Sequence, residues 1–174
     1  AWVARGMVAP FIMVDELIYS ELAKSFADSG RFLLRDVPTT GYGLLYPVVI
    51  SPAYALFDSI PQAYAAVKTI NAFVMSLAGI PAFLLARRVL PAGWSLLAAV
   101  LALGLPSLLY TTTVMTENLF YPLFLFAAWA LLRMVERPTW WGAIGLYALV
   151  AAAAATRIQA VAIVAAILTA PVLF

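Results

Sequence analysis

The sequence predicts an all-α protein, a polytopic transmembrane helical bundle with interfacial amphipathic helices in its first extracytoplasmic loop. Of the 174 residues, 66% are hydrophobic and only 10% are charged, and the mean hydropathy is +1.01. A soluble domain carries about 25% charged residues, and a small one cannot hide this much apolar surface in its core. Apolar runs of near-spanning length also recur between short charged turns. The composition therefore excludes a soluble enzyme and a disordered chain.

The charged and reactive residue types exclude several kinds of partner and catalytic site. The net charge is +2, from 10 Lys and Arg against 8 Asp and Glu, and no basic cluster suggests a nucleic-acid partner. The chain has no His and no Cys, which excludes a Ser-His-Asp triad, an HExxH zinc site, a thiolate nucleophile and a disulfide. Any catalysis must come from carboxylates, cations, hydroxyls and amides.

The first part of the chain predicts an extracytoplasmic loop that carries helices on the membrane surface. Residues 1–14 are interpreted as the end of a preceding span, and residues 15–61 as the loop. Residues 15–29 are too charged to cross a bilayer, so we expect an interfacial helix with Asp15 as its N-cap and Gly30 as its stop. Its apolar stripe is Leu17, Ile18, Leu22 and Phe26.

The rest of this loop predicts an irregular segment and a second short helix. Residues 31–45 contain two Arg, an Asp, a Pro and two Gly, a composition typical of a loop. Residues 46–57 are apolar but number about a dozen, and Pro47 and Pro52 interrupt them. This length favours an interfacial or re-entrant helix over a span.

Residues 62–174 predict four spans and the start of a fifth. Each apolar run approaches the roughly 20 residues that a bilayer requires. We expect a kink near Pro81 in the first span. The predicted spans are residues 63–86, 94–113, 118–133 and 140–156, and the fifth begins in 158–174. With apolar sequence running to its last residue, the chain is expected to be an internal piece of a larger membrane protein.

The positive-inside rule predicts which end of the bundle faces the cytoplasm. The turns at residues 87–93 and 133–139 concentrate Arg, so we place both on the cytoplasmic side. Ionisable groups at membrane level are expensive and tend to mark function. Those predicted near the opposite side are Asp15, Glu16, Glu117 and Arg157, with Lys68 about two turns into the first span.

Each of these residues also has a purely structural interpretation. The acids can cap helices, since negative charge in a first turn is favourable. Lys68 can extend its ammonium to the interface, and Arg157 can anchor a turn. Sequence alone leaves these alternatives open.

The order of these features resembles a known family. It combines an Asp-Glu pair, an amphipathic stretch ending in Gly, a Tyr-Pro helix, a Lys-x-x-Asn span, a Thr-Glu-Asn-Leu entry and a Thr-Arg turn. The stretches are VDELIYSELAKSFADSG, GYGLLYPVVISPAYALF, YAAVKTINAFVMSLAGIPAFLLARRV, MTENLFYPLFLFA and ATRIQAV. The chain resembles the amino-terminal half of a GT-C superfamily membrane glycosyltransferase. The group includes protein O-mannosyltransferases, aminoarabinose transferases and actinobacterial arabinosyltransferases.

The resemblance implies a function and a set of site residues. Asp15 would be the general base, with Glu16 as its partner. Lys68, where many relatives have Arg, and Arg157 would bind the donor phosphate, while Asp15 and Glu117 would hold a divalent metal such as Mg, Mn or Zn. The implied reaction is inverting sugar transfer from a polyprenyl-phosphate donor to an extracytoplasmic glycan, lipid or protein acceptor. The expected location is a bacterial plasma membrane, among its lipids, with the active site on the extracytoplasmic side.

Two other classes of protein remain compatible with the residues. A transporter or lipid flippase would use the same charges to line a pathway. A non-catalytic scaffold subunit would use Asp15 and Glu117 only as helix caps.

Overall fold

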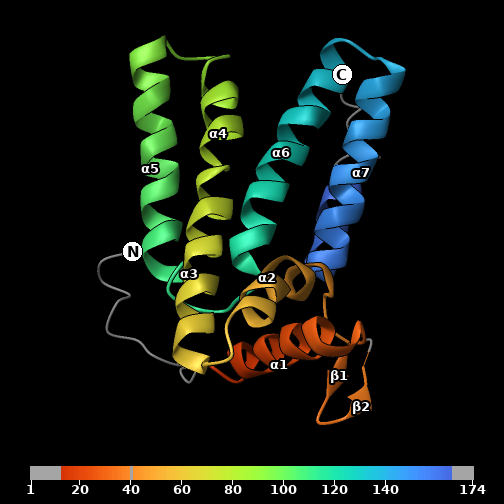
Figure 1. The fold of residues 1–174 in the computed structure, drawn as a ribbon. Helices are drawn as coiled ribbons and strands as arrows, with labels where there is room; N and C mark the ends of the chain where they lie inside the picture. The colour runs from red at the N-terminus through yellow and green to blue at the C-terminus, as the bar shows by residue number, and fades with distance from the viewer. Residues whose placement is uncertain (1–12, 40, 166–174) are drawn as a thin grey trace.

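The computed structural model describes residues 13–39 and 41–165, and within them the chain is predominantly helical (Figure 1). The expectations for residues 1–12 and 166–174, a preceding span and most of a fifth span, lie outside this described part. The elements are α1 Val14–Ser29, β1 Leu33–Leu34, β2 Val37–Pro38, α2 Leu45–Leu56, α3 Ile60–Ser76, α4 Gly79–Ala86, α5 Ala92–Tyr110, α6 Glu117–Glu136, α7 Trp140–Thr156 and the 3₁₀ helix η2 Ile158–Ala160. The predicted all-α class is confirmed, apart from one short hairpin.

Helix α1 ends as predicted but begins differently. Gly30 has φ 68°, and its N–H donates to the Phe26 carbonyl at 2.9 Å, so the glycine stop is confirmed. The N-cap is Met13, not Asp15. The Glu16 carboxylate turns back and accepts a hydrogen bond from the Met13 N–H at 3.3 Å, as the third helical residue does in a capping box.

The buried face of α1 also differs from the predicted apolar stripe. Leu22 is buried as expected, but Leu17 is 54% exposed, whereas Glu16 and Ser20 are buried. Helix α1 packs along α2. The small side chains of Ser20 and Ala23 permit this close packing, and Glu16 finds hydrogen-bond donors inside the protein, so polar residues occupy the face that the sequence assigned to water.

Residues 33–38 form a two-stranded antiparallel hairpin where the sequence predicted a loop. Leu33 pairs with Pro38 and Leu34 pairs with Val37. Arg35 and Asp36 lie between them with φ of 52° and 64°. Two successive left-handed residues give the type I′ turn that matches the twist of paired strands.

Helices α3 and α4 form one long, interrupted helical segment. The interruption falls at Leu77 and Ala78, between the two helices. Pro81 explains its position, because a proline ring clashes with the carbonyl four residues earlier, here that of Leu77. That carbonyl instead accepts from the Ile80 N–H at 3.2 Å. The predicted kink near Pro81 is confirmed.

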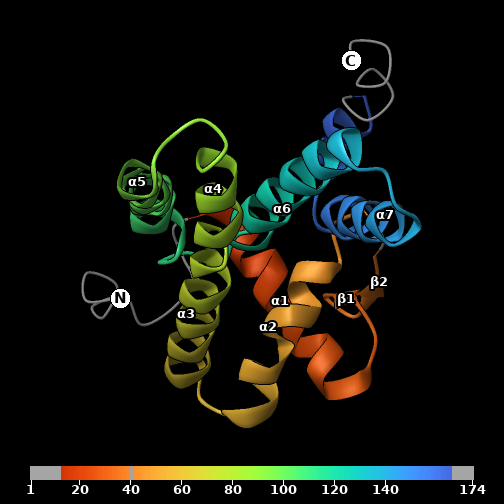
Figure 2. The same ribbon diagram turned by 90° about the horizontal axis from the view of Figure 1, so that it is seen from above.

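Two helical segments of the described chain are long and apolar enough to cross a membrane, Ile60–Ala86 and Glu117–Glu136. Helices α2 and α7 are apolar but shorter. Helix α7 begins and ends at the residues predicted from the sequence, Trp140 and Thr156. Seen from above, α4 lies between α5 and α6, with α7 beyond α6 (Figure 2).

The two ends of the bundle carry different elements. Helices α1 and α2 and the hairpin lie across one end, and the α4–α5 and α6–α7 turns lie at the other (Figure 1). Arg88 and Glu136 form an ion pair that joins these two turns. The α5–α6 loop and the end of α7 return to the α1 end, so Glu117 and Arg157 lie at the same end of the helices as Asp15.

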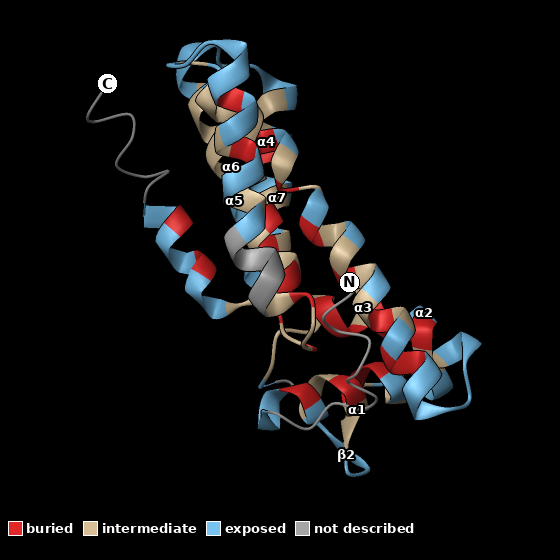
Figure 3. Cartoon of the chain, turned by 90° about the vertical axis from the view of Figure 1, so that its left-hand side faces the viewer, coloured by how far each residue is buried: buried red, intermediate tan, exposed pale blue. Residues whose placement is uncertain are grey.

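The apolar residues form two separate cores. One lies between α1, α2, α3 and the α5–α6 loop and centres on Tyr46, Ile50, Tyr64, Val67 and Val114. The second joins α6, α7 and the following residues through Ala127, Leu146, Val150, Ala153, Ala160 and Ile163. The outer faces of the long helices remain largely uncovered (Figure 3). Large apolar side chains exposed there include Phe73, Trp94, Leu101, Ile144 and Tyr147.

Candidate functional site

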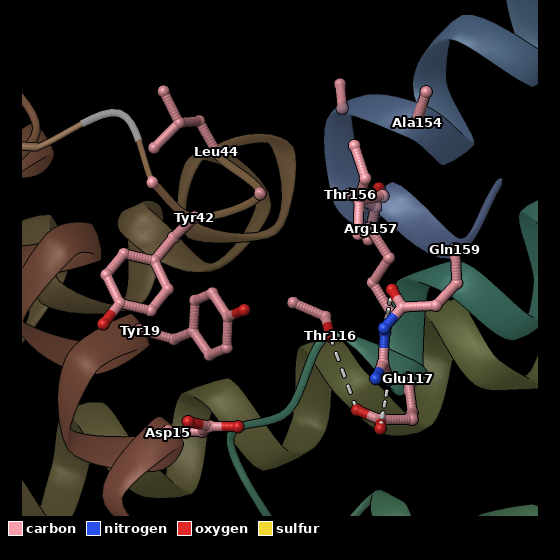
Figure 4. A pocket seen from close by; sticks show the side chains of 14 residues that line it. Asp15, Tyr19, Tyr42, Leu44, Thr116, Glu117, Ala154, Thr156, Arg157 and Gln159 are labelled. Carbon is pink, nitrogen blue, oxygen red and sulfur yellow. Dashed lines mark hydrogen bonds and ion pairs between the residues drawn. The ribbon is translucent and has the colours of Figure 1, made fainter. Parts of the chain in front are cut away.

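A cavity of about 570 Å³ opens where α1, the loop before α2, the start of α6 and the end of α7 converge. Its polar lining is contributed by Asp15, Tyr19, Tyr42, Thr116, Glu117, Thr156, Arg157 and Gln159. Figure 4 shows Asp15 and the two tyrosines on one side of the cavity and Glu117 with Arg157 on the other. The cavity therefore brings residues from four distant parts of the chain into one place.

Asp15 presents an accessible carboxylate to this cavity. It is the second residue of α1 and is exposed. Within the described part of the chain it forms no hydrogen bond or ion pair. An acid in the first turn of a helix is stabilised by the helix dipole, so this position tolerates a charge that has no partner.

Tyr19 lies one helical turn after Asp15, on the same face of α1. Burial raises the pKa of the Tyr19 hydroxyl, and the nearby negative charge of Asp15 raises the same pKa further. The Tyr19 ring meets Tyr42 edge-on at 6.2 Å between centroids and Tyr46 at 5.8 Å. This aromatic wall fixes the side of the cavity next to Asp15.

The opposite side carries an ion pair between Arg157 and Glu117. The Arg157 Nε also donates to Gln159 Oε1 at 3.2 Å. The pair is partly open to solvent, with side-chain exposures of 29% and 21%. Glu117 begins α6 and Arg157 directly follows α7, so the pair holds the ends of two helices together beside Asp15.

Two asparagine amides hold the α5–α6 loop that leads to Glu117. The Asn71 Nδ2 donates to the Thr113 carbonyl at 3.0 Å. The Asn118 Nδ2 lies within 3.0–3.1 Å of the carbonyls of Tyr110, Thr113 and Met115. These bonds satisfy carbonyls that follow the end of α5 and fix where α6 begins.

A glycine sets the distance between the loop before α2 and the end of α7. A Cβ at Gly43 would overlap the Thr156 carbonyl, whereas a Cβ at Gly41 would meet no atom within 4 Å. The loop backbone therefore rests directly against the last turn of α7. Both contacting segments line the cavity, and Tyr42 lies across it from Arg157 (Figure 4).

Glu16, predicted as the catalytic partner of Asp15, lies in the protein interior and does not line the cavity. It is 0% exposed. Its Oε1 accepts from the Val114 N–H at 2.9 Å and from the Tyr64 hydroxyl at 3.3 Å. Its other oxygen accepts from the Met13 N–H. Glu16 thus anchors α1 to α3 and to the α5–α6 loop.

Lys68, predicted to bind the donor phosphate, is also absent from the described lining of the cavity. Its Nζ lies 4.8 Å from the centroid of the Tyr64 ring, in a cation–π contact on α3. The structure therefore brings together Asp15, Glu117 and Arg157 and leaves Glu16 and Lys68 outside the cavity.

Sequence reasoning did not single out the other polar lining residues, Tyr19, Tyr42, Thr116, Thr156 and Gln159. For Tyr19 a signal existed, because a residue four positions after Asp15 shares its helix face. For Tyr42 the flanking Gly41 and Gly43 indicated a closely packed loop.

Among the described lining residues, the carboxylates are Asp15 and Glu117, and Glu117 is already paired with Arg157. Among the described residues, no group of three or more His, Cys, Asp or Glu side chains is gathered. Two carboxylates completed by water and substrate phosphate suit Mg²⁺ or Mn²⁺ better than Zn²⁺, which prefers nitrogen and sulfur ligands.

Comparisons with protein-family models, with curated proteins and with solved structures found no match to this chain.

Proposed function

We propose that this protein is an integral-membrane glycosyltransferase that moves a sugar from a polyprenyl-phosphate donor to an extracytoplasmic acceptor. The apolar composition, the two helical segments of spanning length and the exposed apolar faces of the long helices support the membrane location. The order of the sequence features supports the reaction class. The cavity at the α1 end supplies charged groups suited to it.

The observation that carries the proposal is an accessible carboxylate and an arginine that face one cavity. An acceptor hydroxyl needs a base, and Asp15 can accept its proton when the hydroxyl lies within hydrogen-bond reach. The donor leaves as a lipid phosphate, which needs no proton from the protein. The positive Arg157 guanidinium would stabilise the negative charge that develops on the leaving oxygen.

The Glu117–Arg157 pair supports this role for Arg157. In the free protein, Glu117 holds the guanidinium beside the cavity. A donor phosphate can bind the guanidinium nitrogens that Glu117 does not use, because guanidinium has five N–H donors. A divalent ion held by Asp15 and Glu117 would supply further positive charge to the phosphate, and nothing in the proposed proton transfer depends on it.

The decisive experiment replaces Asp15 by Asn in the purified protein. Asp15→Asn keeps the size of the side chain but removes its basicity, so transfer from a radiolabelled polyprenyl-phosphate sugar should fall about 10²–10⁴-fold. The melting temperature should not change, because Asp15 has no partner among the described residues, and donor binding measured without divalent metal should not change either.

The matched control is Asp36→Asn, the same chemical change at the exposed hairpin turn. It should retain full transfer activity. Full activity in Asp15→Asn would refute the general-base assignment and would favour the transporter or scaffold alternatives.

Arg157 is tested by a pair of substitutions. Arg157→Lys keeps the charge but loses the planar fork, and Arg157→Gln loses both. We expect the KM for the donor to rise in both variants, more in Gln than in Lys. An unchanged KM in Arg157→Gln would exclude donor binding by this residue.

A further inference from the structure

A second cavity lies on another side of α1, away from Asp15. It has a volume of about 600 Å³ and is enclosed by α1, the end of α2 and the start of α3. Charges of both signs line it: the acids Glu21, Asp28 and Asp58, and the cations Lys24 and Arg35. The Glu21 carboxylate also accepts the Arg35 backbone N–H at 2.6 Å, which fixes the hairpin at the cavity edge.

The wall of this cavity contains a buried polar group, the Ser20 hydroxyl, that forms no hydrogen bond to a described residue. Ser20 is 9% exposed, and no described residue lies in hydrogen-bond geometry with its Oγ. The Tyr54 hydroxyl lies beside it, but the two hydroxyls do not meet in hydrogen-bond geometry. A buried polar atom is normally satisfied, so an unpaired one in a cavity wall indicates a missing partner.

An apolar groove of about 560 Å³ adjoins this cavity between α2 and α3. Its lining includes Leu56, Ala65, Ala66 and Ile70. Phe57 lines both the groove and the charged cavity. A polar chamber and an apolar groove that share one residue suit an amphiphilic ligand with a charged head and a hydrocarbon tail.

We propose that the charged cavity and the apolar groove form one binding site for a membrane phospholipid with an ammonium-bearing, zwitterionic headgroup. Asp28 and Asp58 are placed to bind the ammonium, and Lys24 and Arg35 to bind the phosphate. The Ser20 hydroxyl gains its missing partner in the headgroup, and an acyl chain enters the groove past Phe57. The inference rests on the membrane location proposed above but not on sugar transfer.

Charge decides between lipid classes. Three acids against two cations give the cavity a net negative charge, which disfavours an anionic headgroup. A primary ammonium can also donate hydrogen bonds to carboxylates, which a trimethylammonium cannot. The site should therefore prefer phosphatidylethanolamine to phosphatidylcholine, and both to phosphatidylglycerol.

The test measures lipid binding without any sugar donor. The purified protein in detergent is titrated separately with phosphatidylethanolamine, phosphatidylcholine and phosphatidylglycerol, and the bound lipid is counted by native mass spectrometry. We expect phosphatidylethanolamine to bind at least about tenfold more tightly than phosphatidylglycerol. Asp58→Asn should weaken phosphatidylethanolamine binding about tenfold, because it removes a charge-assisted hydrogen bond.

Two further variants make the result specific. Ser20→Ala, which keeps α1 helical, should weaken phosphatidylethanolamine binding severalfold by removing a neutral hydrogen bond. Asp36→Asn removes the same charge as Asp58→Asn outside the cavity and should bind like the wild type. Equal binding of all three lipids, or an equal loss in Asp36→Asn and Asp58→Asn, would overturn the proposal. A failure of the sugar-transfer proposal would not alter these measurements.

Discussion

Two faces of α1 carry neighbouring acids, Asp15 and Glu16, in opposite environments. Asp15 lies on the face that opens to the cavity, where no described group pairs with it. Glu16, one residue and about 100° further around the helix, lies on the face that packs into the protein and accepts hydrogen bonds from three donors. Of two chemically similar side chains, Asp15 is thus accessible to a substrate in the cavity, whereas Glu16 holds α1 against the rest of the protein.

The difference shows that packing, not residue type, decides what an acid does. A carboxylate that is buried and saturated with hydrogen bonds is poorly available to accept a substrate proton. A carboxylate at an open cavity is available, and its removal costs the fold little. Substitutions on the two faces should therefore have different effects: a change at Glu16 should lower stability, and a change at Asp15 should lower activity.

The largest effect on stability is expected at Glu16. Glu16→Leu leaves the Val114 N–H without this acceptor in the interior, whereas the Tyr64 hydroxyl still has the Thr112 carbonyl at 2.9 Å. We expect a loss of about 3 kcal/mol in the free energy of unfolding, measured by denaturant titration in detergent micelles. Asp15→Asn should unfold at the wild-type denaturant concentration. Equal destabilisation by both substitutions would remove the contrast between the faces.

A smaller effect is expected where the loop before α2 meets α7. Gly43→Ala places a Cβ against the Thr156 carbonyl, so the loop must move away from the cavity wall. We expect a loss of about 2 kcal/mol in stability, typical of overpacking, together with reduced sugar transfer. Gly41→Ala is the matched control, since its Cβ meets no neighbour within 4 Å. A stable, fully active Gly43→Ala variant would show that this contact does not shape the cavity.

The smallest effect on stability is expected at Tyr46, a residue of α2 in the core that packs against α1. Tyr46 is buried and donates a hydrogen bond to Asn71 Oδ1 at 3.0 Å. Tyr46→Phe should cost about 1 kcal/mol at neutral pH.

Tyr46 also predicts a dependence on pH. Burial raises the pKa of the Tyr46 hydroxyl well above the value of about 10 that it has in an unfolded chain. Its contribution to stability is therefore complete below about pH 10 and is lost as the pH rises above that value. Unfolding measured between pH 9 and 11 should show a smaller decline in Tyr46→Phe than in the wild type. Parallel curves would contradict this assignment.

The helices were largely predictable because their signals are local. Gly30 can adopt the left-handed conformation that ends α1. Pro81 cannot form the helical hydrogen bond to the carbonyl four residues before it, and its ring clashes with that carbonyl. The bounds of α7 followed from an apolar run between Thr139, whose hydroxyl accepts the Gly142 N–H at 3.1 Å, and the polar Arg157. Each of these features depends only on nearby residues.

The site was only partly predictable because its composition depends on packing between distant segments. The sequence placed Asp15, Glu117 and Arg157 at one end of the bundle, and topology alone was sufficient for that. It could not distinguish Glu16 from Asp15, because the donors to Glu16 come from Val114 and Tyr64. For Lys68 a signal existed, because Tyr64 lies four residues before it on the same helix and its ring can therefore meet the Lys68 ammonium.

The ion pair between Arg88 and Glu136, at the end far from the cavity, has a kinetic consequence. It joins the α4–α5 turn to the α6–α7 turn, so it can form only after both helical hairpins have formed and met. An interaction absent from the folding transition state leaves the folding rate unchanged and slows unfolding. If this pair forms only after that transition state, its whole contribution appears in the unfolding rate; because an exposed pair contributes about 0–1 kcal/mol, it lengthens the lifetime of the folded state at most about fivefold.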